Sequence, residues 1–184
     1  MHAHLVSRLT PDDHLRGNDG AAITLVMYGD YESSWCGLLH SLVRIVQRVM
    51  KGGVRVAYRH FPRTNDHPHA QHAAEIAEAA GYRGRFWAMH DLLFEHQDAL
   101  DDQDLIKYAA AVGLDPGWAM AVLRVHAFTE RVRRDILSGV QSGVSEIPTL
   151  YINDFRYEDA QNAPSLIVAI QNARYIARRR LLFP

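Results

Sequence analysis

Apolar and polar positions along the chain predict a strand, a helix and a second strand in its first third. The run AAITLVMYGD, residues 21–30, is apolar and rich in β-branched residues, which is typical of a buried strand. From Ser34 to Val49 apolar residues recur every three or four positions, which predicts a helix that ends at Gly52. In the segment VRVAYRHF, residues 54–61, apolar and polar residues alternate, which predicts the second strand. Such a strand–helix–strand unit places its two strands parallel.

The pattern then stays helical for about 75 residues before strand character returns (boundaries good to a few residues). Helices are expected at Ala70–Ala80 and Phe86–His96, and in three further stretches. The segments IPTLYI and FRYE, separated by Asn153 and Asp154, predict a β-hairpin, and residues 164–180 predict a final helix. We therefore expect an α/β fold in three parts: residues 1–62 (strand, helix, strand), 63–140 (helical insertion) and 141–184 (hairpin and helix).

Composition narrows the classes of function. The 184 residues carry a formal net charge of −1, which argues against a nucleic-acid or membrane-surface partner. No apolar run approaches the ~20 residues that span a bilayer. The N-terminal segment lacks the pattern of a secretory signal, and with the leading Met1 this predicts a cytoplasmic protein, or a periplasmic one if a signal has been removed. The single cysteine cannot form an internal disulfide, and the sequence does not indicate an oligomeric state.

The candidate chemistry lies in GDYESSWCG, residues 29–37, where the predicted strand leads into the helix. A helix N-terminus stabilises a nearby anion, so a thiol placed there ionises more easily. Ser33 and Cys36 are three residues apart, which places them on one face of the first turn. Asp30 and Glu32 precede the helix, and we interpret them as solvated loop carboxylates.

This segment resembles the active-site segment of the DsbA-like thioredoxin-fold family, which typically reads Gly-Asp-Tyr-Glu-Cys-Pro-Tyr-Cys-Gly. The resemblance continues, in order, through YRHFP, HPHAQHAAEIAEAAG, FWAMHDLLFEHQDAL, ERVRRDILSGVQSGV and IPTLYIN, and covers most of residues 14–160. It implies a thioredoxin fold interrupted by a helical domain. It also implies thiol-disulfide oxidoreductase activity on protein or small thiol and disulfide substrates.

The resemblance assigns roles to individual positions. Cys36 matches the second, resolving cysteine, and Ser33 stands where the family has its nucleophilic cysteine. Ser34 and Trp35 occupy the variable dipeptide, where the tryptophan offers an extended substrate a flat apolar contact. Pro148 matches a proline whose peptide bond is cis and which faces the motif. The backbone beside it is free to pair with an extended substrate in a groove that Ile147 and Thr149 line.

The serine at position 33 leaves three functions open. A hydroxyl cannot form a disulfide, so the dithiol cycle cannot run in this chain. Cys36 alone could exchange with glutathione or a protein client. Alternatively, Ser33 could hold the thiol of bound glutathione, as the serine of kappa-class glutathione transferases does. The third reading is a non-catalytic peptide-binding module, or a laboratory Cys-to-Ser change; serine is also a good helix N-cap. No bound cofactor is expected, and glutathione is the co-substrate of the first two readings.

Histidine is abundant, with 11 residues, and four of them cluster in HFPRTNDHPHAQH. They are His60, His67, His69 and His72. His69 and His72 could share a helix face, but a closed metal site requires three or four converging ligands. We therefore predict no metal site here.

Overall fold

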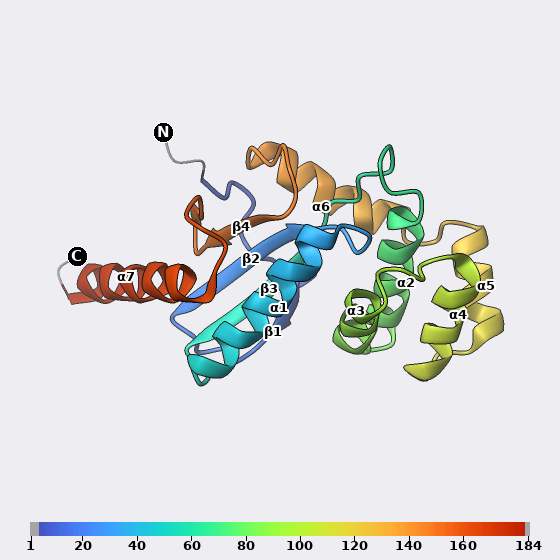
Figure 1. The fold of residues 1–184 in the computed structure, drawn as a ribbon, viewed down its shortest axis with the longest axis horizontal. Coiled ribbons are helices and arrows are strands. Elements are labelled where there is room, and N and C mark those ends of the chain that lie inside the picture. The colour runs from blue at the N-terminus through green and yellow to red at the C-terminus, as the bar shows by residue number, and fades with distance from the viewer. Residues whose placement is uncertain (1–3, 183–184) are drawn as a thin grey trace.

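A five-stranded sheet forms the centre of the computed structural model, which describes residues 4–182 (Figure 1). Its strand order is β1-β3-β2-β4-β5. Strands β2 and β3 are parallel and the other neighbours are antiparallel. The strands are β1 (His14–Arg16), β2 (Ile23–Gly29), β3 (Val54–His60), β4 (Thr149–Ile152) and β5 (Phe155–Arg156). The predicted parallel pair and the predicted hairpin are confirmed, and β1 was not predicted.

Seven helices surround this sheet in the described part of the chain. They are α1 (Ser34–Val49), α2 (Ala70–Tyr82), α3 (Phe86–Glu95), α4 (Asp102–Ala111), α5 (Pro116–Arg124), α6 (Thr129–Gln141) and α7 (Ala163–Leu182). Helix α1 runs across the front of the sheet, α2 to α5 form a group beside it, and α7 projects from the opposite side (Figure 1). Among the described residues, no helix has both the length and the apolar character that crossing a membrane requires.

Both faces of the sheet are buried, which explains the uninterrupted apolar run of β2. Leu25 and Met27 point into the larger core, together with buried residues of α1, α7 and the insertion helices. Val26 and Tyr28 point into a smaller core on the other face, which the N-terminal segment covers. Helix α6 approaches this second face closely, because a Cβ at Gly139 would lie 2.9 Å from the Phe61 ring. A strand between two cores cannot show the alternation of a half-exposed strand.

A buried charge network joins the insertion helices to the sheet. Glu78 of α2 lies 2.9 Å from Nε2 of His14 on β1 and 2.9 Å from Nε2 of His60 on β3. Asp135 of α6 accepts a hydrogen bond from the backbone N–H of His60, and Arg131 contacts both carboxylates. Burial alone would raise the pKa of Glu78, but the hydrogen bonds and charges of His14 and His60 hold it well below its ordinary value. The insertion is therefore attached by ionic contacts as well as by apolar packing.

Candidate functional site

The junction between β2 and α1 positions the motif. Strand β2 ends at Gly29, and α1 begins at Ser34 with Ser33 as its N-cap. The Ser33 Oγ accepts a hydrogen bond from the backbone N–H of Cys36 at 3.4 Å, and Ser33 is buried. Capping satisfies one of the unpaired N–H groups of the first turn, a role that serine performs well. The hydroxyl is therefore engaged in building the helix.

Cys36 faces the core and is inaccessible to solvent. Its exposed fraction is 0%, and the backbone N–H of Asp30 lies 3.5 Å from its Sγ as a donor. Burial raises the pKa of the Cys36 thiol to about 11, although the Ser33 hydroxyl and the Asp30 amide offset part of this increase. At neutral pH the thiolate fraction is then on the order of one in ten thousand. The Cys36 thiol is therefore inaccessible to a disulfide substrate, and it is almost entirely protonated at neutral pH.

The carboxylates of the motif loop are structural. The Asp30 carboxylate is fully buried and accepts hydrogen bonds from the backbone N–H groups of Glu32 and Arg63, both at 2.8 Å. It also lies 2.8 Å from Nδ1 of His67. Glu32 accepts a hydrogen bond from the N–H of His69 at 2.8 Å. Our interpretation of Asp30 as a solvated loop carboxylate was wrong, because this side chain ties the motif loop to the segment after β3.

Gln97, which no sequence pattern singled out, holds the same loop from the insertion side. Its Nε2 donates to the carbonyl oxygens of Tyr31 at 2.6 Å and Ser33 at 2.8 Å. Its Oε1 would lie 2.1 Å from a Cβ at position 37, so any other residue there would displace the Gln97 amide. Gly37 therefore permits these two hydrogen bonds. The sequence contained no signal for this contact, since an isolated Gln after a helix is common.

The loop before β4 lies next to the motif. Thr149 pairs with Tyr28 near the end of β2, and the Ile147–Pro148 peptide bond is cis. Pro148 and Thr149 line a cavity of about 320 Å³ together with Leu39 of α1 and polar residues around β5. Ile147 packs against the larger core. The structure thus brings Pro148 and Thr149 to the side of α1, although Ser33, Ser34 and Trp35 do not line this cavity.

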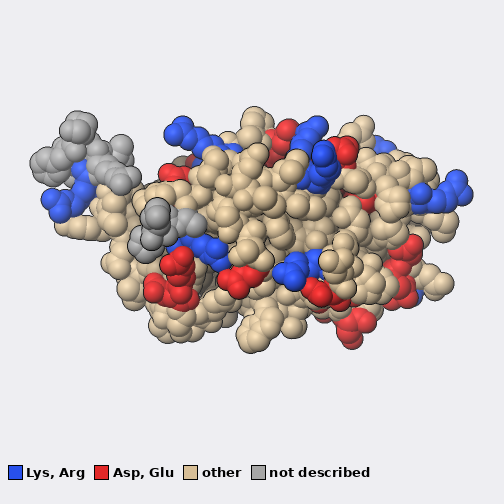
Figure 2. Space-filling view, turned by 90° about the horizontal axis from the view of Figure 1, so that it is seen from above, with Lys and Arg blue, Asp and Glu red and all other residues tan. Residues whose placement is uncertain are grey.

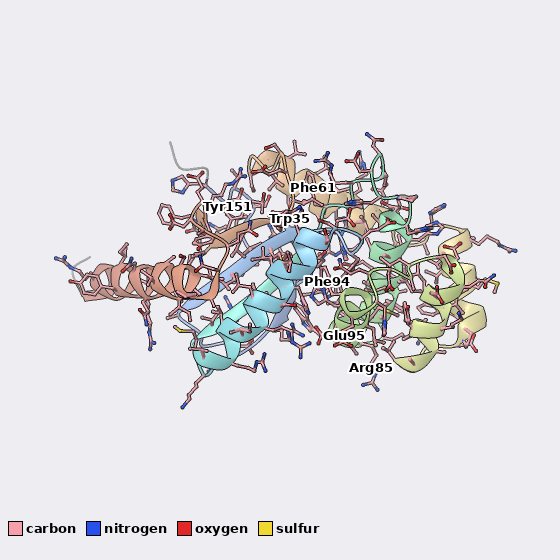
Figure 3. The ribbon with its side chains drawn as sticks, viewed as in Figure 1. Trp35, Phe61, Arg85, Phe94, Glu95 and Tyr151 are labelled. Carbon is pink, nitrogen blue, oxygen red and sulfur yellow. The ribbon has the colours of Figure 1, made fainter. Side chains whose placement is uncertain are left out.

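The variable dipeptide faces solvent. Ser34 is exposed, and Trp35 is 66% exposed at the upper end of α1 (Figure 3). Seen from above, this side of the molecule is covered mostly by residues other than Lys, Arg, Asp and Glu (Figure 2). An exposed indole is suited to apolar contact with a ligand.

Three of the four clustered histidines contact three different carboxylates and do not converge on one point. His60, His67 and His72 contact Glu78, Asp30 and Asp102, respectively. Two other groups each place three ligand atoms within 4.8 Å of one another: His40, His90 and Asp91, and His60, Glu78 and Asp135. In the second group Arg131 already supplies positive charge to both carboxylates.

The first of these groups is part of a buried hydrogen-bond chain. The Tyr31 hydroxyl lies 3.0 Å from Nδ1 of His90, whose Nε2 lies 3.2 Å from Nδ1 of His40. Nε2 of His40 faces Asp91 at 3.6 Å, and Arg16 binds the same carboxylate at 2.8 Å. Burial lowers the pKa of His40 to about 4, with Asp91 opposing this shift, and lowers that of His90 well below its ordinary value.

This chain predicts a loss of stability in mild acid. The pKa of His40 falls from an ordinary 6.5 to about 4 on folding, so the unfolded state binds protons more readily between these values. The free energy of unfolding should therefore drop by about 1 kcal/mol per pH unit below pH 6.5 for each such histidine. Urea unfolding at pH 7 and pH 5 measures the slope. His40→Gln should flatten it, whereas the exposed control His96→Gln should not; an unchanged slope in His40→Gln would contradict the prediction.

Comparison with known proteins identifies the family and the solved structures that share this architecture. A family profile described as Thioredoxin matches residues 9–172. The chain belongs to the thioredoxin family. Within it, oxidised BdbD from Bacillus subtilis superimposes with a TM-score of 0.82 at 21% identity, covering 89% of this chain and 94% of that one. Alpha-DsbA1 from Wolbachia pipientis gives a TM-score of 0.79 at 17% identity, covering 94% and 96%. This thioredoxin-family chain therefore has the DsbA-like fold that its sequence resemblance predicted.

A curated relative shows the same domain in a longer polypeptide. "Na(+)/H(+) antiporter NhaA 3" from Salinispora tropica is 40% identical over 177 residues, which is 96% of this chain and 27% of the relative. The thioredoxin-family chain thus spans about a quarter of that protein's length. Most of the relative lies outside the match.

Proposed function

We propose that this thioredoxin-family chain does not perform dithiol exchange and instead binds an extended polypeptide beside its motif. The burial of Cys36 is the observation that carries the proposal. It is the only cysteine, it is inaccessible, and its raised pKa keeps the thiol protonated at neutral pH. The neighbouring position holds Ser33, whose hydroxyl caps α1. Neither half of a redox pair is in a reactive state.

The features that contact a substrate are retained. Trp35 offers an exposed apolar surface at the start of α1. Within the part of the chain that the structure describes, the backbone N–H and C=O of Ile147 make no hydrogen bond. Free backbone groups can pair with an extended chain as a neighbouring strand would, while pockets beside them receive side chains. The cavity at Pro148 and Thr149 supplies such a pocket.

The two glutathione-dependent alternatives gain no support from the geometry. Monothiol exchange needs an accessible Cys36, and Cys36 is buried. A transferase that used Ser33 would need a hydroxyl that a bound thiolate can reach, whereas Ser33 is buried. We therefore keep polypeptide binding as the proposed activity.

The name of the Salinispora tropica relative bears on the kind of protein in which this domain occurs. Because the chain matches only about a quarter of a protein named as a Na⁺/H⁺ antiporter, we propose that it corresponds to an accessory binding module of such proteins and does not itself transport ions. A cytoplasmic location remains our prediction. A single buried cysteine forms no internal disulfide, so this fold does not depend on an oxidising compartment.

Binding of a permanently unfolded polypeptide tests the proposal. Carboxymethylated α-lactalbumin should bind saturably in calorimetry, and Trp35→Ala should weaken binding about tenfold, because aromatic residues dominate such contacts. Cys36→Ala should leave the affinity unchanged. Tyr82→Ala is the matched control, since Tyr82 is 71% exposed but lies in the insertion. Absence of binding, or an equal loss in both aromatic variants, would refute the proposed function.

A further inference from the structure

Helix α1 carries a second apolar stripe that the described chain covers only in part. Its buried side packs on the sheet through residues such as Leu39 and Val43. Next to that side lies a row that we call the outer stripe, formed by Trp35, Leu38, Leu42, Ile45 and Val49. All of these are exposed except Leu42, which is partly buried. The stripe runs the full length of α1, and this helix lies at the front of the molecule, between α7 and the insertion helices (Figure 1).

The spacing of the outer stripe is that of a helix–helix seam. Its five positions follow one another at intervals of three, four, three and four residues. This alternation is the a/d pattern by which one helix packs against another. A helix that only packs on its own sheet needs one apolar face, so the outer stripe exceeds what folding of this domain requires.

The lower end of the stripe is surrounded by cations without acidic partners. Arg48 lies one turn after Ile45, and Lys51 lies just beyond the end of α1. Arg174 of α7 approaches the same end, with its Nη1 3.8 Å from a Cβ at Gly53. None of Arg48, Lys51 and Arg174 forms an ion pair within residues 4–182. The Nε of Arg174 is buried and has no hydrogen-bond partner there. A buried, unpaired guanidinium N–H is costly unless an acceptor reaches it.

We propose that the outer stripe of α1 binds an amphipathic helix that carries acidic residues beside its apolar seam. The apolar seam of that partner packs between α1 and α7, and its carboxylates pair with Arg48, Lys51 and Arg174. The positive charge of these three residues favours an acidic partner over a basic one. The single-residue width of the stripe favours a helix over a lipid surface, which calls for a broad apolar face. This surface shares Trp35 with the proposed polypeptide site at the upper end of α1 and extends from there to Val49 at the other end of the helix.

A synthetic peptide tests this inference. The probe is a fluorescein-labelled amphipathic helix of about three heptads, with Leu along its seam and Glu beside it. Fluorescence anisotropy should show saturable binding that weakens with added salt. Val49→Glu should lower the affinity at least about tenfold. Its matched control is Val140→Glu on α6, since Val49 is 55% and Val140 is 58% exposed, and this control should bind as the wild type does.

A charge variant gives an independent check. Arg48→Glu/Lys51→Glu should also lose about tenfold in affinity, while Arg85→Glu/Arg124→Glu, an equal charge change in the insertion, should not. Circular dichroism confirms that each variant is folded. The inference is overturned if the acidic helix does not bind, or if a Lys-for-Glu version binds equally well. It is also overturned if Val49→Glu abolishes a dimer of the chain seen in sedimentation, or association with phosphatidylglycerol vesicles, and leaves peptide binding intact. Val49→Glu should leave the binding of carboxymethylated α-lactalbumin unchanged, because Val49 lies at the opposite end of α1 from Trp35, so the two proposals fail separately.

Discussion

Ser33→Cys is expected to convert the protein into a dithiol oxidoreductase. The substitution restores two thiols three residues apart at the start of α1, with Cys36 beneath the new one. The helix N-terminus favours the thiolate of the outer residue, and the buried thiol can resolve a mixed disulfide. Insulin reduction in the presence of dithiothreitol should accelerate by about two orders of magnitude over the wild type.

Two matched variants distinguish the effect of a complete dithiol motif from the effect of an additional thiol alone. Ser34→Cys introduces an exposed sulfur at the wrong spacing and should not catalyse the reaction. Ser33→Cys/Cys36→Ala should trap mixed disulfides without turnover. The wild type should acquire no glutathione adduct from oxidised glutathione in mass spectrometry, because Cys36 is buried and protonated. An active wild type, or an inactive Ser33→Cys that is correctly folded, would count against the proposed loss of dithiol chemistry.

Glu78→Gln is expected to destabilise the fold by about 3 kcal/mol, because it removes a buried carboxylate that pairs with Arg131 and is hydrogen-bonded to two histidines. The carboxylate contacts His14, His60 and Arg131, and the variant leaves Asp135 as the one carboxylate of this network. Urea unfolding at pH 7 measures the difference.

The exposed pair Glu130–Arg133 provides the control for this prediction. Glu130→Gln should change stability by less than about 0.5 kcal/mol, since surface pairs contribute little. Glu78 has a lowered pKa in the folded state, so its contribution is present above its unfolded value of 4.5 and is lost as the pH falls below it. The gap between the wild type and Glu78→Gln should therefore narrow in acid. A gap that is small at pH 7, or that widens below pH 4.5, would contradict this account.

Local periodicity predicted the sheet and most helices because each of these elements shows its pattern within a short window. Strand β2 and helix α1 are examples, and so is the hairpin around Asn153. Strand β1 could not be predicted, because His14–Arg16 is three residues long and owes its position to pairing with β3. Helix α2 continues through Gly81 to Tyr82, past the expected stop, because it packs among buried neighbours.

The candidate site was predictable in its residues and not in their environment. The motif and Pro148 follow from resemblance, and the register of β4 with β2 brings them near each other. The burial of Asp30 depends on Arg63 and His67, which come from a different segment, and no local pattern predicts such contacts. Gln97 and Glu78 were missed for the same reason. Their partners are distant in sequence, and the residues themselves look like ordinary surface side chains.

The contacts of the motif loop have a mechanical consequence. One amide, that of Gln97, spans from the insertion to two carbonyls of the loop, and Asp30 and Glu32 tie the same loop to the segment that enters α2. A tilt of the insertion against the sheet therefore cannot leave the surface around Trp35 unchanged. A ligand that altered that tilt would therefore also shift the motif loop.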